Sequence, residues 1–187
     1  MLCPMDFIVL ISCAVLLIVQ SCHALRNYDA TKRINDLMLL KLDKPVMRTK
    51  TVKCLPLGDT NKYPAAGTSC LVAGWGKTNH NATTPSDVLR SVHVTVIDRK
   101  KCNSPKNYNG KPLITSGQIC AGSVVEGVAD TCGGDSGGPL LCNGALVGVT
   151  SFGKVDKRGI KQYPGVYSFL SKKQIIWIKK TMEKSEI

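Results

Sequence analysis

Acidic residues, aromatic side chains and long apolar runs are scarce in this 187-residue chain. Only 13 Asp and Glu stand against 25 Lys and Arg, giving a formal net charge of +12, and aromatic residues make up 5% of the chain. The single long apolar run excludes a membrane protein with several spanning helices. Hydrophobic residues still reach 43%, which excludes disorder throughout, because disordered chains lack the side chains for a core. The length fits one globular domain.

The apolar run covers residues 7–19, which suits the core of a secretory signal peptide and is too short to span a bilayer. Small residues at Ser21 and Ala24 supply cleavage sites. We predict a signal peptide-like segment over residues 1–24, no stable membrane insertion after its removal, and a secreted or secretory-granule location. The alternatives are a buried strand and a segment foreign to the fold.

The cysteine pattern favours disulfide bonds over a metal site. No Cys-x-x-Cys pair occurs, so we expect no bound metal. Removal of residues 1–24 leaves an even number of cysteines, which is typical of disulfides in exported chains. These are Cys54, Cys70, Cys102, Cys120, Cys132 and Cys142. Asn81 begins the one N-glycosylation sequon, and its polar surroundings favour an exposed loop.

Turn residues recur about every ten positions, a rhythm typical of all-β sandwiches and barrels. The candidate strands are residues 37–42, 69–73, 88–97, 139–142, 145–151 and 165–170. One helix is expected near the end, where Ser171 and Gln174 have the spacing of a capping box. Apolar residues at helical spacing follow, at Ile175, Ile178 and Met182. We expect this stripe to pack on the body while the lysines face water.

Residues 130–139 read Asp-Thr-Cys-Gly-Gly-Asp-Ser-Gly-Gly-Pro and carry the strongest functional signal. The hexapeptide 134–139 would arise by chance in about one in 10⁵ chains of this length. A nucleophilic serine needs a tight turn with nearby backbone N–H groups available to a developing oxyanion, and glycines permit such a turn. We predict Ser136 as the nucleophile, and the N–H groups of Gly134 and Ser136 as the oxyanion hole.

Five further segments, with the Ser136 string, resemble the trypsin-like serine proteases of the chymotrypsin fold, and most closely the tryptase-type granzymes. They are residues 35–42, 70–78, 118–122, 148–153 and 163–167. The resemblance implies an all-β, trypsin-like double β-barrel with a C-terminal helix over residues 25–187. Strands that would complete the first barrel do not precede Tyr28. We therefore expect an incomplete first barrel and a domain truncated at its N-terminal side.

The resemblance also implies roles for single residues. Asp36 resembles the triad carboxylate that orients a catalytic imidazole. Asp130 resembles the carboxylate at the floor of the primary specificity pocket, which implies polypeptide substrates with Lys or Arg at the cleavage site. The implied substrate-binding residues are Asp130, Ser151, Phe152, Gly153 and Gly165. The two glycines match pocket walls, and residues 151–153 match the strand that pairs with the substrate backbone.

Two disulfides are implied in the same way, Cys70–Cys142 and Cys102–Cys120. The family partner of Cys132 would lie between Gly153 and Gly165, where this chain has no cysteine. Cys54 and Cys132 are then left over. We expect at least one free or intermolecular thiol, which permits a disulfide-linked dimer.

The chain departs from the family pattern at the general base and at the activation sequence. None of the three histidines, His23, His80 and His93, has the family's position well before Asp36. No Ile-Val-Gly-Gly-like sequence occurs, so Asp135, beside the nucleophile, would be a buried carboxylate without its cation. We expect a serine-type endopeptidase by resemblance, with no cofactor, and negligible hydrolysis by the chain as written.

The alternative is a non-catalytic, secreted pseudoprotease that binds polyanions such as sulfated glycosaminoglycans. Lysine and arginine crowd the C-terminal part of the chain, and such charge attracts polyanions by counterion release. The simpler interpretation is that the lysines only solvate the surface. No nucleic-acid-binding motif accompanies the charge, so we expect no specific nucleic-acid partner.

Overall fold

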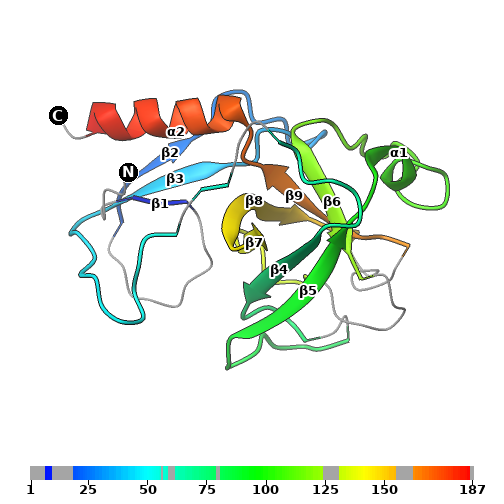
Figure 1. Ribbon diagram of the computed structural model, residues 1–187, viewed down its shortest axis with the longest axis horizontal. Helices are drawn as coiled ribbons and strands as arrows, with labels where there is room; N and C mark the ends of the chain where they lie inside the picture. Colours follow the sequence, from blue (N-terminus) through cyan, green and yellow to red (C-terminus); the bar gives the residue numbers. More distant parts are fainter. Residues whose placement is uncertain are drawn as a thin grey trace.

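The computed structural model describes residues 7–9, 19–55, 57–58, 62–78, 81–123, 131–154 and 162–185. Figure 1 shows a barrel beside a smaller sheet, with one long helix along the top. The elements are β1 (Phe7–Val9), β2 (Val19–Ala24), β3 (Met38–Leu42), β4 (Ser69–Gly74), β5 (Arg90–Val96), α1 (Arg99–Cys102), β6 (Gln118–Gly122), β7 (Pro139–Cys142), β8 (Ala145–Phe152), β9 (Gly165–Phe169) and α2 (Lys172–Ser185).

Six strands close into an antiparallel barrel in the order β4-β5-β6-β9-β8-β7. Its interior is filled by side chains from facing strands, including Val94, Ile119, Leu140 and Tyr167. Strand β7 alternates between half-buried and buried residues, and its buried Leu140 and Cys142 belong to this core. Closure leaves the barrel without an open strand edge.

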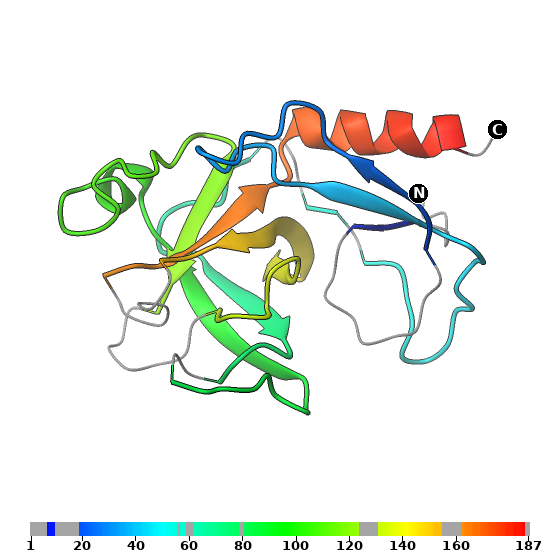
Figure 2. The same cartoon turned by 180° about the vertical axis from the view of Figure 1, so that it is seen from behind.

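The second sheet has three strands in the order β1-β3-β2, so β1 and β2 form its edges. Helix α2 joins this sheet to the barrel, because Ile175 and Ile178 share one apolar cluster with Leu37 and Leu39 beside β3 and with Val149 of β8. Figure 2 shows from behind how α2 runs along β2 and β3 while the barrel lies to one side. The structure confirms the predicted trypsin-like architecture, with one closed barrel and a smaller sheet in place of the other.

The predicted strands agree with the observed ones at most positions. Strand β7 has the predicted bounds, and β3, β4, β5, β8 and β9 differ from them by at most two residues at either end. Three strands were not predicted as such, β1, β2 and β6. Strand β6 is buried at all five positions, so it lacks the alternation by which a half-exposed strand is found.

The predicted helix forms, but the predicted capping box is wrong. The Ser171 hydroxyl donates to the Gln174 side-chain Oε1, so the two side chains bond to each other and not to the backbone N–H groups at the helix start. The apolar stripe is confirmed, because Ile175 and Ile178 are buried and Met182 packs against their cluster.

The cysteines agree with the implied pairing and correct one expectation. Cys70–Cys142 and Cys102–Cys120 are disulfides, with sequence separations of 72 and 18 residues. Cys54 is also disulfide-bonded, to a partner that is not among the described residues, so the expectation that it is left over is wrong. That expectation counted only the cysteines after residue 24. Cys132 is buried and outside any disulfide, and Cys22 lies exposed on β2.

Residues 19–24 of the predicted leader pair with β3, with His23 opposite Leu39 and Ala24 opposite Met38. Their side chains alternate between exposed and half-buried. Cleavage after Ser21 or Ala24 would therefore remove β1 and part or all of β2, the two edge strands of the smaller sheet, and the leader stays a prediction. No helix in the described ranges is long and apolar enough to cross a membrane.

Candidate active site

The predicted nucleophile, Ser136, lies exposed on a tight turn between Cys132 and β7. Gly134 and Gly137 flank it with φ of +100° and +83°, a conformation that favours glycine. The Gly137 N–H donates to the Thr150 carbonyl of β8 at 2.8 Å, which fixes the turn against the barrel. Within the described residues, neither the Gly134 nor the Ser136 N–H has a hydrogen-bond acceptor in the protein. Both donors are therefore available to a ligand oxygen.

Asp135 anchors the same turn from behind. Its carboxylate accepts the Gly76 N–H at 2.7 Å and the Cys132 N–H at 2.8 Å. Glycine is required at Gly74 and Gly76, because a Cβ there would come within 2.1 Å and 2.5 Å of this carboxylate. The expected burial is wrong, since Asp135 is half-buried and has two backbone donors. Among the described residues no cation forms an ion pair with it.

Asp36 is held between the smaller sheet and the barrel. Its Oδ2 accepts the Ser151 hydroxyl of β8 at 2.5 Å. Its backbone carbonyl accepts the Ser168 hydroxyl of β9 at 2.7 Å. These two bonds cross 115 and 132 residues of sequence, so the carboxylate is positioned by the tertiary fold.

Asp36 and Ser136 line one cavity of about 230 Å³ between the smaller sheet and the barrel. The cavity's other lining residues are Leu37, Met38, Gly137, Val149, Thr150 and Ser151. The structure thus brings together a serine hydroxyl, two available N–H donors and a carboxylate, although 100 positions separate the two predicted catalytic residues. These are the parts of a serine acyl-transfer site other than its base.

The described histidines lie elsewhere. His23 Nε2 is 2.9 Å from the Ser21 Oγ on β2, and His93 Nδ1 is 3.3 Å from the Ser69 Oγ on the barrel. Neither lines the cavity. His80 lies outside the described residues.

The predicted substrate-binding residues are placed in part. Ser151 lines the cavity, Phe152 ends β8 and Gly153 follows it. Gly165 begins β9, and the next residue, Val166, lies opposite Phe152. Asp130 lies outside the described residues. The exposed turn at Asn81 agrees with the predicted loop around the sequon.

A second cavity, of about 430 Å³, lies behind the Ser136 turn. Its walls are mainly the ends of β4 and β5 with the connection between them, including Val72, Val88 and Leu89. Asp135 supplies its carboxylate, and Lys77 and Arg90 also line it. The cavity therefore combines an apolar wall with an anionic group.

Sequence reasoning missed two hydroxyls of this site. Ser151 was predicted to contact substrate and not to hold Asp36, and Ser168 was not singled out. No spacing or motif in the sequence connects either serine to Asp36, because the contacts depend on how β8 and β9 pass the smaller sheet. The same holds for Arg33, whose guanidinium lies over Phe152.

Comparisons with known proteins agree with this geometry. The family model described as Trypsin matches residues 15–178. Granzyme A of Bos taurus is 48% identical over 83% of this chain and 58% of its own length. Kallikrein-11 of Homo sapiens is 42% identical over 80% of this chain and 50% of its own length. This chain therefore spans only about half of these relatives.

A solved structure gives the same result for the fold. The structure of neuropsin, described as a serine protease expressed in the limbic system of mouse brain, aligns with a TM-score of 0.78 and 35% sequence identity. The alignment covers 89% of this chain and 71% of that one. With Ser136 and Asp36 lining one cavity, these matches establish that the chain belongs to the trypsin family of serine proteases.

Proposed function

We propose that this chain carries the nucleophile, the oxyanion donors and the orienting carboxylate of a secreted or granule-stored serine endopeptidase that cleaves after Lys or Arg. The observation that carries the proposal is the cavity shared by Ser136 and Asp36. In the implied reaction, a histidine takes the Ser136 proton as the oxygen attacks the scissile carbonyl. The Gly134 and Ser136 N–H groups stabilise the oxyanion, the amine leaves with the proton, and water then releases the acyl group.

The base in this reaction is a histidine, and no histidine lines the described cavity. Loss of a triad member typically leaves only about 10³–10⁴-fold acceleration over water. We therefore expect negligible turnover by the 187-residue chain. A longer protein that supplies the histidine would complete the site, and its new N-terminal amine would pair with Asp135 in the 430 Å³ cavity.

The test is to treat native protein from expressing cells with a fluorophosphonate probe and to sequence both the labelled peptide and the mature N-terminus. Labelling at Ser136 in a species that opens with an Ile-Val-Gly-Gly-like sequence supports the proposal. An unlabelled species that opens near Leu25 overturns it for this chain and favours a binding role.

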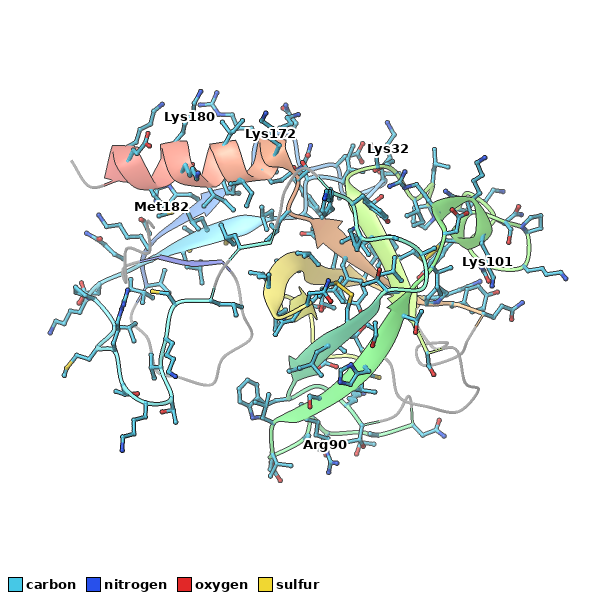
Figure 3. All side chains as sticks on the ribbon, in the orientation of Figure 1. Lys32, Arg90, Lys101, Lys172, Lys180 and Met182 are labelled. Carbon is cyan, nitrogen blue, oxygen red and sulfur yellow. A yellow bond between two sulfur atoms is a disulfide. The ribbon has the colours of Figure 1, made fainter. Side chains whose placement is uncertain are left out.

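One observation favours that second role, polyanion binding. Figure 3 shows Lys172 and Lys180 of α2 pointing away from the smaller sheet, while Met182 lies on the opposite side of the helix. The exposed lysines of this helix are Lys172, Lys173, Lys179, Lys180 and Lys184. They form a cationic ridge, which would attract sulfated polysaccharides by releasing counterions.

Heparin chromatography distinguishes binding at the cationic ridge of α2 from binding through the overall net charge. The test variant changes Lys172, Lys173, Lys179 and Lys180 to Gln. The control changes four exposed lysines elsewhere to Gln, namely Lys44, Lys50, Lys53 and Lys62. Elution of the parent above roughly 0.5 M salt, reduced far more by the test set than by the control, supports a site on α2. If both sets lower the eluting salt concentration equally, heparin binding depends only on the net charge of the protein.

A further inference from the structure

Arg33 extends its guanidinium over the face of Phe152, which follows the cavity-lining Ser151 in the chain. The guanidinium carbon lies 4.8 Å from the ring centroid, within the range of a cation–π contact. Phe152 directly follows Ser151, which holds Asp36, and Arg33 itself is three residues before Asp36. One cation is thus fixed at the point where the two halves of the site meet.

The backbone of Arg33 is fixed in a conformation that its residue type rarely adopts. Its φ is +52°, in the left-handed region that favours glycine. The buried Gln118 holds it there, donating from Nε2 to the Arg33 carbonyl at 2.9 Å. The other end of Gln118 accepts the Thr115 N–H at 2.9 Å, so the clamp is itself fixed. Strained residues of this kind concentrate at functional sites.

A second cation lies two residues beyond Phe152. Lys154 Nζ is 4.0 Å from the ring centroid of Tyr163. Tyr108 connects the two cation–π pairs, with its ring 6.1 Å from that of Phe152 and 6.2 Å from that of Tyr163. The result is a line of rings with one cation at each end.

No carboxylate of the described residues pairs with either cation. In the described ranges the one ion pair joins Lys32 to Asp29, at 3.6 Å. Within the part of the chain that the structure describes, the charged groups of Arg33 and Lys154 contact aromatic rings. Aromatic faces orient a cation without cancelling its charge, so both groups keep their capacity to attract an anion.

We propose that Arg33 and Lys154 select polypeptide substrates with acidic side chains on the acyl side of the cleaved bond. This inference rests on the proposed function, in which the substrate backbone runs along Ser151, Phe152 and Gly153. A chain extended along that segment passes first Arg33 and then Lys154. Its side chains alternate in direction, so Asp or Glu within the three residues before the cleaved Lys or Arg can pair with the two cations.

The test measures binding, so that it does not depend on turnover. The Ser136→Ala chain is titrated with two fluorescein-labelled peptides that end in Arg, one with Glu-Glu-Ala and one with Gln-Gln-Ala before it. We expect the Glu peptide to bind about five-fold more tightly at low salt, since each partly exposed ion pair contributes modestly, and the difference to shrink at high salt.

Variants assign the preference to these two cations. Arg33→Gln with Lys154→Gln is expected to abolish the preference for Glu while leaving the affinity for the Gln peptide unchanged. Arg33→Gly also removes the guanidinium, and glycine tolerates the left-handed backbone at this position. This variant therefore distinguishes the effect of the lost charge from an effect on folding. Lys32→Gln is the matched control, because it removes the neighbouring charge and leaves Arg33 in place.

Three outcomes overturn the inference. Equal affinity for both peptides refutes acidic selection and leaves the proposed endopeptidase intact. Failure of both peptides to bind refutes the acidic selection together with the proposed substrate cleft. Equal weakening of both peptides by Arg33→Gln would show that Arg33 only maintains the fold.

Discussion

The Ser151 hydroxyl of β8 donates to the Asp36 carboxylate, with 2.5 Å between Oγ and Oδ2. The bond joins the closed barrel to the segment that enters the smaller sheet, so it connects the two sides of the candidate active site. Loss of a hydrogen bond to a charged group typically costs about 1.5–3 kcal/mol.

We expect Ser151→Ala to lower the free energy of unfolding by about 1.5 kcal/mol, because the half-buried carboxylate loses a donor. Urea unfolding measures this change. Ser116→Ala, at an exposed serine of a turn, serves as the control and is expected to have little effect. If the two variants lose the same stability, Ser151 does not hold Asp36 in solution.

Asp135 gives a second prediction, because its carboxylate borders a cavity that also has an apolar wall. A dipeptide such as Ile-Val, with a free amine, is expected to bind there and to raise the melting temperature. At ten times its Kd, the ligand would stabilise the fold by about 1.4 kcal/mol. Acetyl-Ile-Val and the Asp135→Asn variant are the controls, and an equal effect of the acetylated peptide would contradict this role of the carboxylate.

Helix α2 offers a matched pair of isoleucines. Ile178 is 3% exposed and packs in the cluster that joins the smaller sheet to the barrel, whereas Ile176 is 44% exposed. We expect Ile178→Ala to destabilise the fold by about 3 kcal/mol and Ile176→Ala by less than about 1 kcal/mol. Chemical denaturation of both variants checks the difference. Similar losses would mean that α2 does not dock on the sheet as described.

The buried phenol of Tyr63 leads us to expect that the free energy of unfolding falls at alkaline pH. Burial raises the pKa of its phenol above the ordinary value of 10.0, and the hydroxyl donates to the Gln118 carbonyl at 3.0 Å. A raised pKa in the folded state means that the neutral form is favoured by folding. The stabilisation is therefore complete below the ordinary pKa and is lost as the pH rises through the folded value.

Tyr63→Phe should consequently be less stable than the parent at about pH 8, where the parent's hydrogen bond is intact. Between about pH 8 and about pH 11, the free energy of unfolding of Tyr63→Phe should fall less than that of the parent. Thermal unfolding across this range measures both effects. Tyr28→Phe is the control, because Tyr28 is 52% exposed. A parallel pH dependence of parent and Tyr63→Phe would refute the assignment.

Local sequence signals predicted the parts of the fold that depend on neighbouring residues. The bounds of β7 were predicted because a glycine-rich turn precedes it and Asn143-Gly144 follows it, both with positive φ in the structure. Strand β6 was missed because all of its residues are buried, which removes the periodic signal. Residues 19–24 read as part of a leader, and pairing with β3 is a tertiary property that composition does not reveal.

In the candidate site, too, features that depend on neighbouring residues were predicted, and contacts between distant residues were not. The glycines around Ser136 predicted its turn, because left-handed and closely approached positions limit the residue type. The order of family-like segments predicted Asp36. Contacts made across the fold were not predictable in this way: Ser151 with Asp36, Gln118 with Arg33, and Arg33 with Phe152. Each depends on strand packing between residues far apart in the chain.

The most direct test of the incomplete triad is hydrolysis of an Arg thiobenzyl ester by the folded 187-residue chain, compared with its Ser136→Ala variant. We predict the same background rate for both, because no described histidine lines the cavity that contains Ser136 and Asp36. Robust turnover by the parent chain that Ser136→Ala abolishes would contradict this, and would mean that a group within the chain already acts as the base.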